Sequence, residues 1–103
     1  MTEHKVVITI DERDNPVPQP TRTVTANKDD TIRWDSPRGP VRIKFAKASP
    51  FDKDEVKGSE AHRVRVEEGV FRYFCSVTVD GKEVGWPGNK SPDAGGEVRI
   101  VRR

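Results

Sequence analysis

The chain contains no leucine and a single methionine, so its aliphatic side chains come almost wholly from valine and isoleucine. β-Branched side chains lose little freedom in strands, and they pack well on a pleated surface. The absence of leucine therefore favours an all-β fold.

Three further absences bear on the environment of the protein. A lone cysteine, Cys75, cannot form an internal disulfide, so nothing in the sequence calls for an oxidising compartment. No run approaches the roughly 20 apolar residues of a membrane span. The first residues, Met1-Thr-Glu-His-Lys5, have no apolar region and no small-residue cleavage site. We therefore expect a soluble protein without a membrane partner, located in the cytoplasm.

The charges are numerous but nearly balanced. Nineteen basic and 17 acidic side chains leave a net charge of +2, which is too even to indicate nucleic acid or membrane as a partner. Hydrophobic residues make up 32% of the 103 residues and charged ones 35%, so the core must come from narrow alternating stripes. The length predicts a single domain over residues 1–103.

The most apolar strand is predicted over residues 70–77. Phe71, Tyr73, Cys75 and Val77 share one face, and the residues between them share the other. The following Asp80-Gly81 pair lies between alternating flanks, which indicates a tight hairpin because both turn positions favour positive φ.

Other segments alternate in the same way, and with the hairpin they give seven or eight strands. Such a number of short strands is typical of a two-sheet sandwich. The further strands are expected at residues 5–10, 22–26, 31–35, 41–45, 61–66 and 97–101. The predicted core consists of Val41, Ile43, Phe45, Val64, Val66, Phe71, Tyr73, Cys75, Val98 and Ile100.

Turn residues punctuate these strands. The Asn27–Asp30 segment is a turn by its residue types, and three prolines predict an unpaired surface crossing between Asp11 and Pro20. The Ser49-Pro50 pair predicts a short helical turn that continues to Glu55.

Two motifs resemble the cupredoxins, the blue-copper fold family. Tyr73-x-Cys75 on a strand that runs into a glycine-bearing loop is similar to the last core strand of that family. The turn leading into Asp30-Thr31-Ile32-x-Trp34 is similar to a second cupredoxin phrase. The resemblance extends from about Val6 to Val101 and implies a Greek-key β-sandwich. An immunoglobulin-like sandwich is the alternative, but the cysteine pair of that family is missing.

The resemblance places Cys75 where the family has its copper thiolate, but the other ligands do not follow. Pro40-Val41 stands where the first histidine is expected, and residues 76–79 hold no second histidine. The only methionine is Met1, and the histidines are His4 and His62. Since a blue-copper centre needs two imidazoles beside the thiolate, we expect no metal and no cofactor. A blue-copper-type electron-transfer protein with an atypical site around Cys75 is the alternative.

The chemistry of Cys75 itself has two interpretations. Free cysteines are often buried, so Cys75 is expected to act as a small hydrophobic side chain against Phe71 and Tyr73. A redox or nucleophilic thiol would need a positive, partly open surrounding, and the adjacent Arg72 points to the opposite face. Neither a Ser-His-Asp set, nor paired carboxylates, nor a glycine-rich phosphate loop can be assembled, so we predict a protein that is not an enzyme.

Two surfaces remain as candidates for binding. A tryptophan in a glycine- and proline-rich loop can be a contact for a protein partner or can fold back onto the sandwich. The predicted partner-binding residues are Trp86, Pro87, Asn89 and Lys90. We therefore expect a binding or protein-interaction module that engages a protein partner or its own copies.

The second candidate surface is basic. If several strands share one sheet, their outward side chains form a face that could receive phosphate, nucleic acid or an acidic protein. These side chains are Arg33, Arg42, Lys44, Arg63, Arg65, Arg72 and Arg99. The alternative is a solvated face in which acidic residues neutralise the arginines. Aromatic residues do not interleave with these bases, which disfavours nucleic acid.

Overall fold

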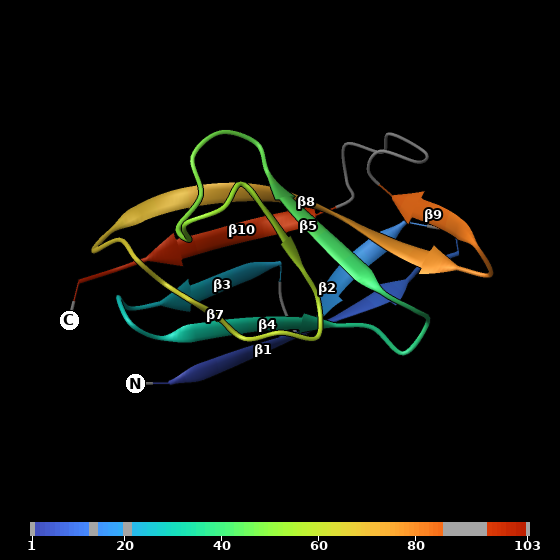
Figure 1. The fold of residues 1–103 in the computed structure, drawn as a ribbon, viewed down its shortest axis with the longest axis horizontal. Helices are drawn as coiled ribbons and strands as arrows, with labels where there is room; N and C mark the ends of the chain where they lie inside the picture. The colour runs from blue at the N-terminus through green and yellow to red at the C-terminus, as the bar shows by residue number, and fades with distance from the viewer. Residues whose placement is uncertain (1, 13–14, 20–21, 86–94, 103) are drawn as a thin grey trace.

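The computed structural model describes residues 2–12, 15–19, 22–85 and 95–102, and within them the fold is all-β without a helix (Figure 1). The described residues form ten strands. In chain order these are β1 (Glu3–Ile10), β2 (Pro16–Gln19), β3 (Thr23–Ala26), β4 (Thr31–Asp35), β5 (Val41–Phe45), β6 (Glu55–Lys57), β7 (His62–Arg63), β8 (Gly69–Val79), β9 (Lys82–Gly85) and β10 (Gly95–Ile100).

The strands form two mixed sheets. One sheet has the order β2-β1-β4-β7 and the other the order β3-β10-β8-β5-β6, with β9 paired to β8. The parallel pairs are β1 with β4 and β3 with β10. Figure 1 shows the sheet that contains β5, β8 and β10 beside the one that contains β1 and β4. The all-β prediction is confirmed.

One core collects buried side chains from both sheets. Of the ten residues predicted for it, eight are buried, while Val66 and Phe71 are partly buried and pack against it. Trp34 lies at its centre, edge-on to Phe45, Phe51 and Tyr73, with ring centroids 5.4 to 6.5 Å apart. Aromatic pairs favour this T-shaped geometry, so the cluster buries a large apolar surface and forms a rigid centre of the core.

Both predicted turns form. Asp80 and Gly81 have φ angles of 51° and 80°, and Val79 pairs with Lys82 across them. In the earlier turn the Asp30 amide donates a hydrogen bond to the Asn27 carbonyl, with an N···O distance of 3.1 Å. The residue types at these two places were therefore sufficient signals.

The prediction of an unpaired crossing between Asp11 and Pro20 is wrong. Residues Pro16–Gln19 form β2, which pairs antiparallel with β1. Proline is tolerated there because β2 is an edge strand. Every second amide position of an edge strand faces away from the neighbouring strand, so a proline without an N–H group loses no ladder hydrogen bond there. Pro16 and Pro18 are buried, so they also contribute apolar surface.

The predicted helical turn from Ser49 to Glu55 is also wrong. The segment is bent rather than helical, and its Phe51 side chain is buried in the core. From residue 54 the chain runs back alongside β5, and the Phe45 amide donates a hydrogen bond to the Asp54 carbonyl at 3.0 Å. The strand expected at residues 61–66 is reduced to β7, because the amides of Val64 and Arg65 donate to the carbonyls of Asp30 and Pro50 instead of to a neighbouring strand. Within the described residues no helix is long and apolar enough to cross a membrane.

Candidate functional site

Cys75 is buried in the core, as predicted from its place in the alternation. It pairs with Ile43 of β5 and has no exposed surface. Burial raises the pKa of the Cys75 thiol to about 12, and the opposing influence of the Arg22 charge is smaller. The thiol is therefore protonated at neutral pH, whereas a reactive cysteine or a copper ligand requires a thiolate.

The two histidines do not complete a copper site. His4 and His62 both pair with Ile32, one on each side, so about two strand spacings, or roughly 10 Å, separate them. His4 Nε2 lies 2.9 Å from the Asp30 carboxylate, and His62 Nε2 lies 2.8 Å from the Lys57 carbonyl. Among the residues that the structure describes, no group of three His, Cys, Asp or Glu side chains could hold a metal ion. The donor set does not fit the copper centre that the resemblance implies.

An open groove of about 940 Å³ lies at the end of the second sheet. Five segments line it: the β4–β5 connection, the start of β5, β6, the β6–β7 connection and the β8–β9 hairpin. Its volume lies within the usual range of ligand sites, about 300–1,000 Å³. The lining residues are Ser36, Gly39, Pro40, Val41, Arg42, Glu55, Lys57, Gly58, Ser59, Thr78 and Glu83.

An ion-pair chain crosses the groove. Arg42 donates through Nε to Glu55 and through a terminal nitrogen to Glu83, the latter at 3.2 Å. These three residues come from β5, β6 and β9, so the chain spans the sheet from edge to edge at this level. Hydrogen bonds to both carboxylates raise the pKa of Arg42 further above its ordinary value, with Glu55 the largest cause. The groove thus presents a fixed guanidinium between two carboxylates, beside the ammonium of Lys57.

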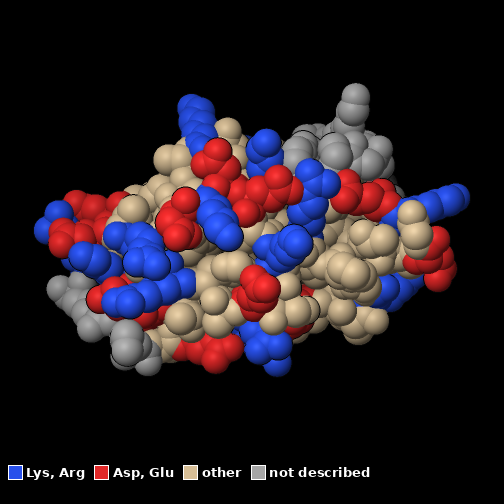
Figure 2. All heavy atoms as spheres, viewed as in Figure 1, with Lys and Arg blue, Asp and Glu red and all other residues tan. Residues whose placement is uncertain are grey.

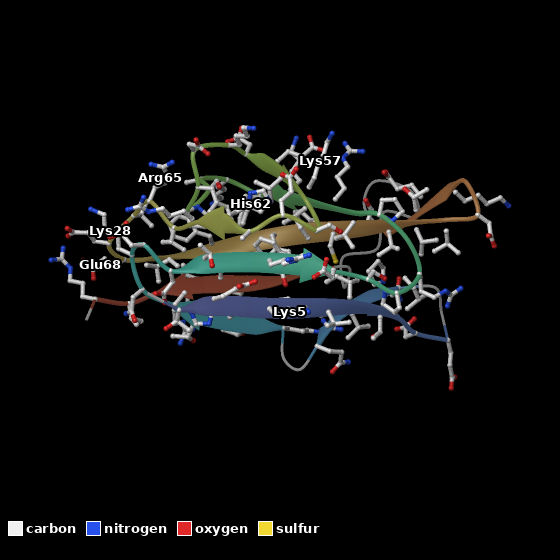
Figure 3. The ribbon with its side chains drawn as sticks, turned by 60° about the horizontal axis from the view of Figure 1, so that its bottom comes forward. Lys5, Lys28, Lys57, His62, Arg65 and Glu68 are labelled. Carbon is white, nitrogen blue, oxygen red and sulfur yellow. The ribbon has the colours of Figure 1, made fainter. Side chains whose placement is uncertain are left out.

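The wall at residues 57–59 is held tightly. The Gly58 amide donates to the Val41 carbonyl at 2.8 Å, and the Ser59 amide donates to the Trp34 carbonyl at the same distance. A Cβ on Gly58 would lie 2.7 Å from the Trp34 carbonyl oxygen, so only glycine fits here. Figure 3 shows His62 below Lys57, where its ring also packs on Phe51 with centroids 5.6 Å apart. The groove is therefore a preformed feature of the fold.

The predicted partner-binding residues, Trp86, Pro87, Asn89 and Lys90, lie outside the described residues. The two ends of their loop are described. Gly85 pairs with Ser76 and Gly95 pairs with Phe74, so the loop leaves and rejoins the same side of β8 on either side of Cys75. The loop follows directly from β9, whose Glu83 lines the groove.

The predicted basic face is divided between the two sheets. Arg33 and Arg63 belong to the first sheet, whereas Arg42, Lys44, Arg72 and Arg99 belong to the second. Carboxylates lie among them, as in the pairs Arg33–Asp35 at 3.0 Å and Arg63–Asp29 at 2.7 Å. Figure 2 shows basic and acidic side chains intermixed over the visible face. The charges form no single-sign surface there.

Sequence reasoning found some of the groove and missed the rest. Arg42 stood out as an outward base, and the Asp80-Gly81 hairpin implied that residues after it would lie beside β8. Glu55 and Lys57 were missed because a three-residue strand after an irregular segment has too little alternation to register.

No protein-family model matches this chain, and no curated protein matches it. Its function is therefore argued from the geometry of its own residues.

Proposed function

We propose that this protein is a non-catalytic, metal-free binding module with a cupredoxin-like sandwich, and that it engages a protein partner or its own copies. The strand order supports the fold assignment. The segment 16–26 divides between the two sheets as β2 and β3, and β8, which carries Tyr73-x-Cys75, lies centrally between β10 and β5. A central strand with this motif is what the resemblance implies.

The observation that carries the binding role is the groove of about 940 Å³. Its glycine and proline backbone leaves room for a ligand, while Arg42, Lys57, Glu55 and Glu83 offer both signs of charge. Mixed charges at fixed positions give specificity and register to a protein contact. The hydroxyls of Ser36, Ser59 and Thr78 add neutral hydrogen-bonding groups at its rim.

The edges of the sheets favour side-chain recognition over the addition of a strand. β6 is three residues long and carries Glu55 and Lys57, and β2 carries two prolines. Short, charged or proline-bearing edge strands resist pairing with another chain. A partner is therefore expected to contact the groove and the loop that follows β9.

Partner capture with matched variants tests this proposal. Immobilised wild-type protein, Lys57→Glu, Trp86→Ala and Arg65→Gln are exposed to the same extract, and retained proteins are quantified by mass spectrometry. We expect a protein that wild type and Arg65→Gln retain equally and that Lys57→Glu loses at least about tenfold, because the substitution places a third carboxylate in the groove. Light scattering of each variant reports self-association.

Two results would contradict the proposal. The first is that the protein is monomeric and that wild type and the three variants all retain the same proteins. The second is an intense blue thiolate charge-transfer band that appears when copper(II) is added to wild type and is absent in Cys75→Ser. That band would restore electron transfer as the function, since it requires a copper–thiolate bond.

A further inference from the structure

A second, smaller cavity lies where β3 and β10 begin. Its volume is about 190 Å³, roughly that of six waters at about 30 Å³ each. Arg22 and Thr23 line it from the start of β3, Arg72 and Tyr73 from β8, and Gly95, Gly96 and Glu97 from β10. It shares no lining residue with the groove.

Two arginines face this cavity without an ion-pair partner among the described residues. Neither Arg22 nor Arg72 takes part in a salt bridge there, whereas Arg33, Arg42, Arg63 and Arg99 all do. The Arg22 charge also lowers the pKa of both Tyr73 and Cys75 against the larger effect of burial, so its guanidinium acts on this part of the core. Two uncompensated guanidiniums at one cavity are an arrangement that favours an anion.

The Tyr73 side chain lies on the core side of the cavity, because it points to the opposite face of β8 from Arg72. Tyr73 has no exposed surface, and its Oη has no hydrogen-bond partner of normal geometry within the described residues. A Cβ on Gly96 would lie 2.7 Å from this oxygen, so the hydroxyl lies directly against a residue that lines the cavity. Burial raises the pKa of Tyr73, although an interaction with Trp34 opposes this, so the phenol keeps its proton.

The two glycines keep the space open. A Cβ on Gly95 would lie 2.1 Å from the Tyr73 carbonyl oxygen, and one on Gly96 would lie 2.3 Å from the Arg22 carbonyl oxygen. Among the described lining residues, the carboxylate of Glu97 is unfavourable for an anion, and Arg99 pairs with it at 3.2 Å. The net charge of the described lining residues is therefore positive.

We propose that this cavity binds a phosphate-sized tetrahedral oxyanion, held by Arg22 and Arg72. The volume admits one such group. Guanidiniums bind phosphate oxygens through paired N–H donors, which makes arginine the side chain best suited to this role. The site is independent of the partner-binding groove.

Titration calorimetry of the full chain with inorganic phosphate tests the site. We expect saturable one-to-one binding that weakens as chloride is raised, because the contacts are ionic. Arg22→Gln and Arg72→Gln should each weaken phosphate binding about tenfold or more. Arg65→Gln, at a base outside the cavity, should leave it unchanged. Sulfate should bind similarly and acetate more weakly, which separates a tetrahedral oxyanion from a carboxylate.

The outcomes are distinguishable from those for the groove. Absence of saturation up to about 10 mM phosphate, or equal loss in Arg65→Gln, would overturn the proposal. Circular dichroism and urea unfolding confirm that each variant is folded, so lost binding is not lost structure. Since Lys57→Glu leaves this cavity untouched, it should bind phosphate normally even where it loses a protein partner.

Discussion

Asp30 shows how one buried carboxylate can hold two distant parts of the chain together. Its oxygens accept hydrogen bonds from the Thr2 amide at 3.0 Å, the Asn27 amide at 3.0 Å and His4 Nε2 at 2.9 Å. The side chain thereby joins the start of β1 to the turn before β4. These hydrogen bonds, with His4 the largest contributor, hold the pKa of Asp30 well below its ordinary value despite the opposing effect of burial.

Replacing this carboxylate should destabilise the fold in a pH-dependent way. Asp30→Asn keeps the shape but offers one acceptor and an unwanted donor, so we expect a loss of about 1–3 kcal/mol at pH 7. Because the folded pKa is lowered, the wild-type advantage is present above the unfolded pKa of about 4 and declines as the pH falls through the folded value. Urea unfolding at pH 7 and at about pH 3 measures both.

A matched variant separates burial from charge. Asp35→Asn removes the Arg33 ion pair, whose side chains are 40% and 25% exposed, and should cost less than about 1 kcal/mol. Equal stability of Asp30→Asn and wild type at pH 7 would show that the hydrogen bonds to Asp30 contribute nothing net.

At the scale of elements, the sequence predicts the long alternating strands well and the short ones poorly. Residues 41–45 and 31–35 are strands with the predicted bounds, because period-two alternation with β-branched and aromatic residues has few other solutions. β2 was missed because its prolines argue against a strand unless the strand is known to lie at an edge. The edge position is a property of the assembled sheet, and local sequence does not reveal it.

The candidate sites follow the same division. Burial of Cys75 could be predicted because its neighbours alternate. The groove could not be predicted. Arg42 and Glu55 are 13 residues apart in sequence, and Glu55 and Glu83 are 28 apart. These side chains meet only when β5, β6 and β9 come together in the folded sheet. Likewise, Arg22, Arg72 and Gly95 line one cavity only because β3 and β8 flank β10.

The glycines that bound the 86–94 loop provide a test of the β8–β9 pairing. Gly85 has a φ of 100°, and a Cβ there would lie 2.5 Å from both the Cys75 carbonyl oxygen and Pro16 Cγ. Gly85→Ala should therefore destabilise the protein by more than about 2 kcal/mol, from backbone strain and steric clash together. Thermal and urea unfolding measure the loss.

Gly81→Ala is the control for Gly85→Ala. Gly81 has a φ of 80° with no atom within 4 Å of an added Cβ, so only the backbone strain remains and the cost should be about 1 kcal/mol. If the two variants lose the same stability, the close packing of Gly85 against β8 and β2 is not what requires glycine there.

At the scale of the whole molecule, the distribution of charge decides which partners are attracted. Nineteen basic and 17 acidic side chains leave +2, and ion pairs interleave them on the described surface. A polyanion is attracted over a distance only by a surface of predominantly one sign. Over the described residues the surface therefore has no extended track of one sign, and the proposed phosphate site is local.

The salt dependence of binding to a single-stranded DNA oligonucleotide separates these possibilities. We expect no measurable binding at about 0.15 M salt, and at lower salt a slope of log K against log[salt] no steeper than about −1.4, the value for two phosphate contacts on a single strand. Fluorescence anisotropy between about 0.02 and 0.2 M salt measures it. Residual binding should disappear in Arg22→Gln and persist in the double variant Arg42→Glu with Arg65→Glu. A slope of about −3 or steeper that the double variant abolishes would instead establish the basic face as the binding surface, since it would require four or more phosphates to be neutralised together.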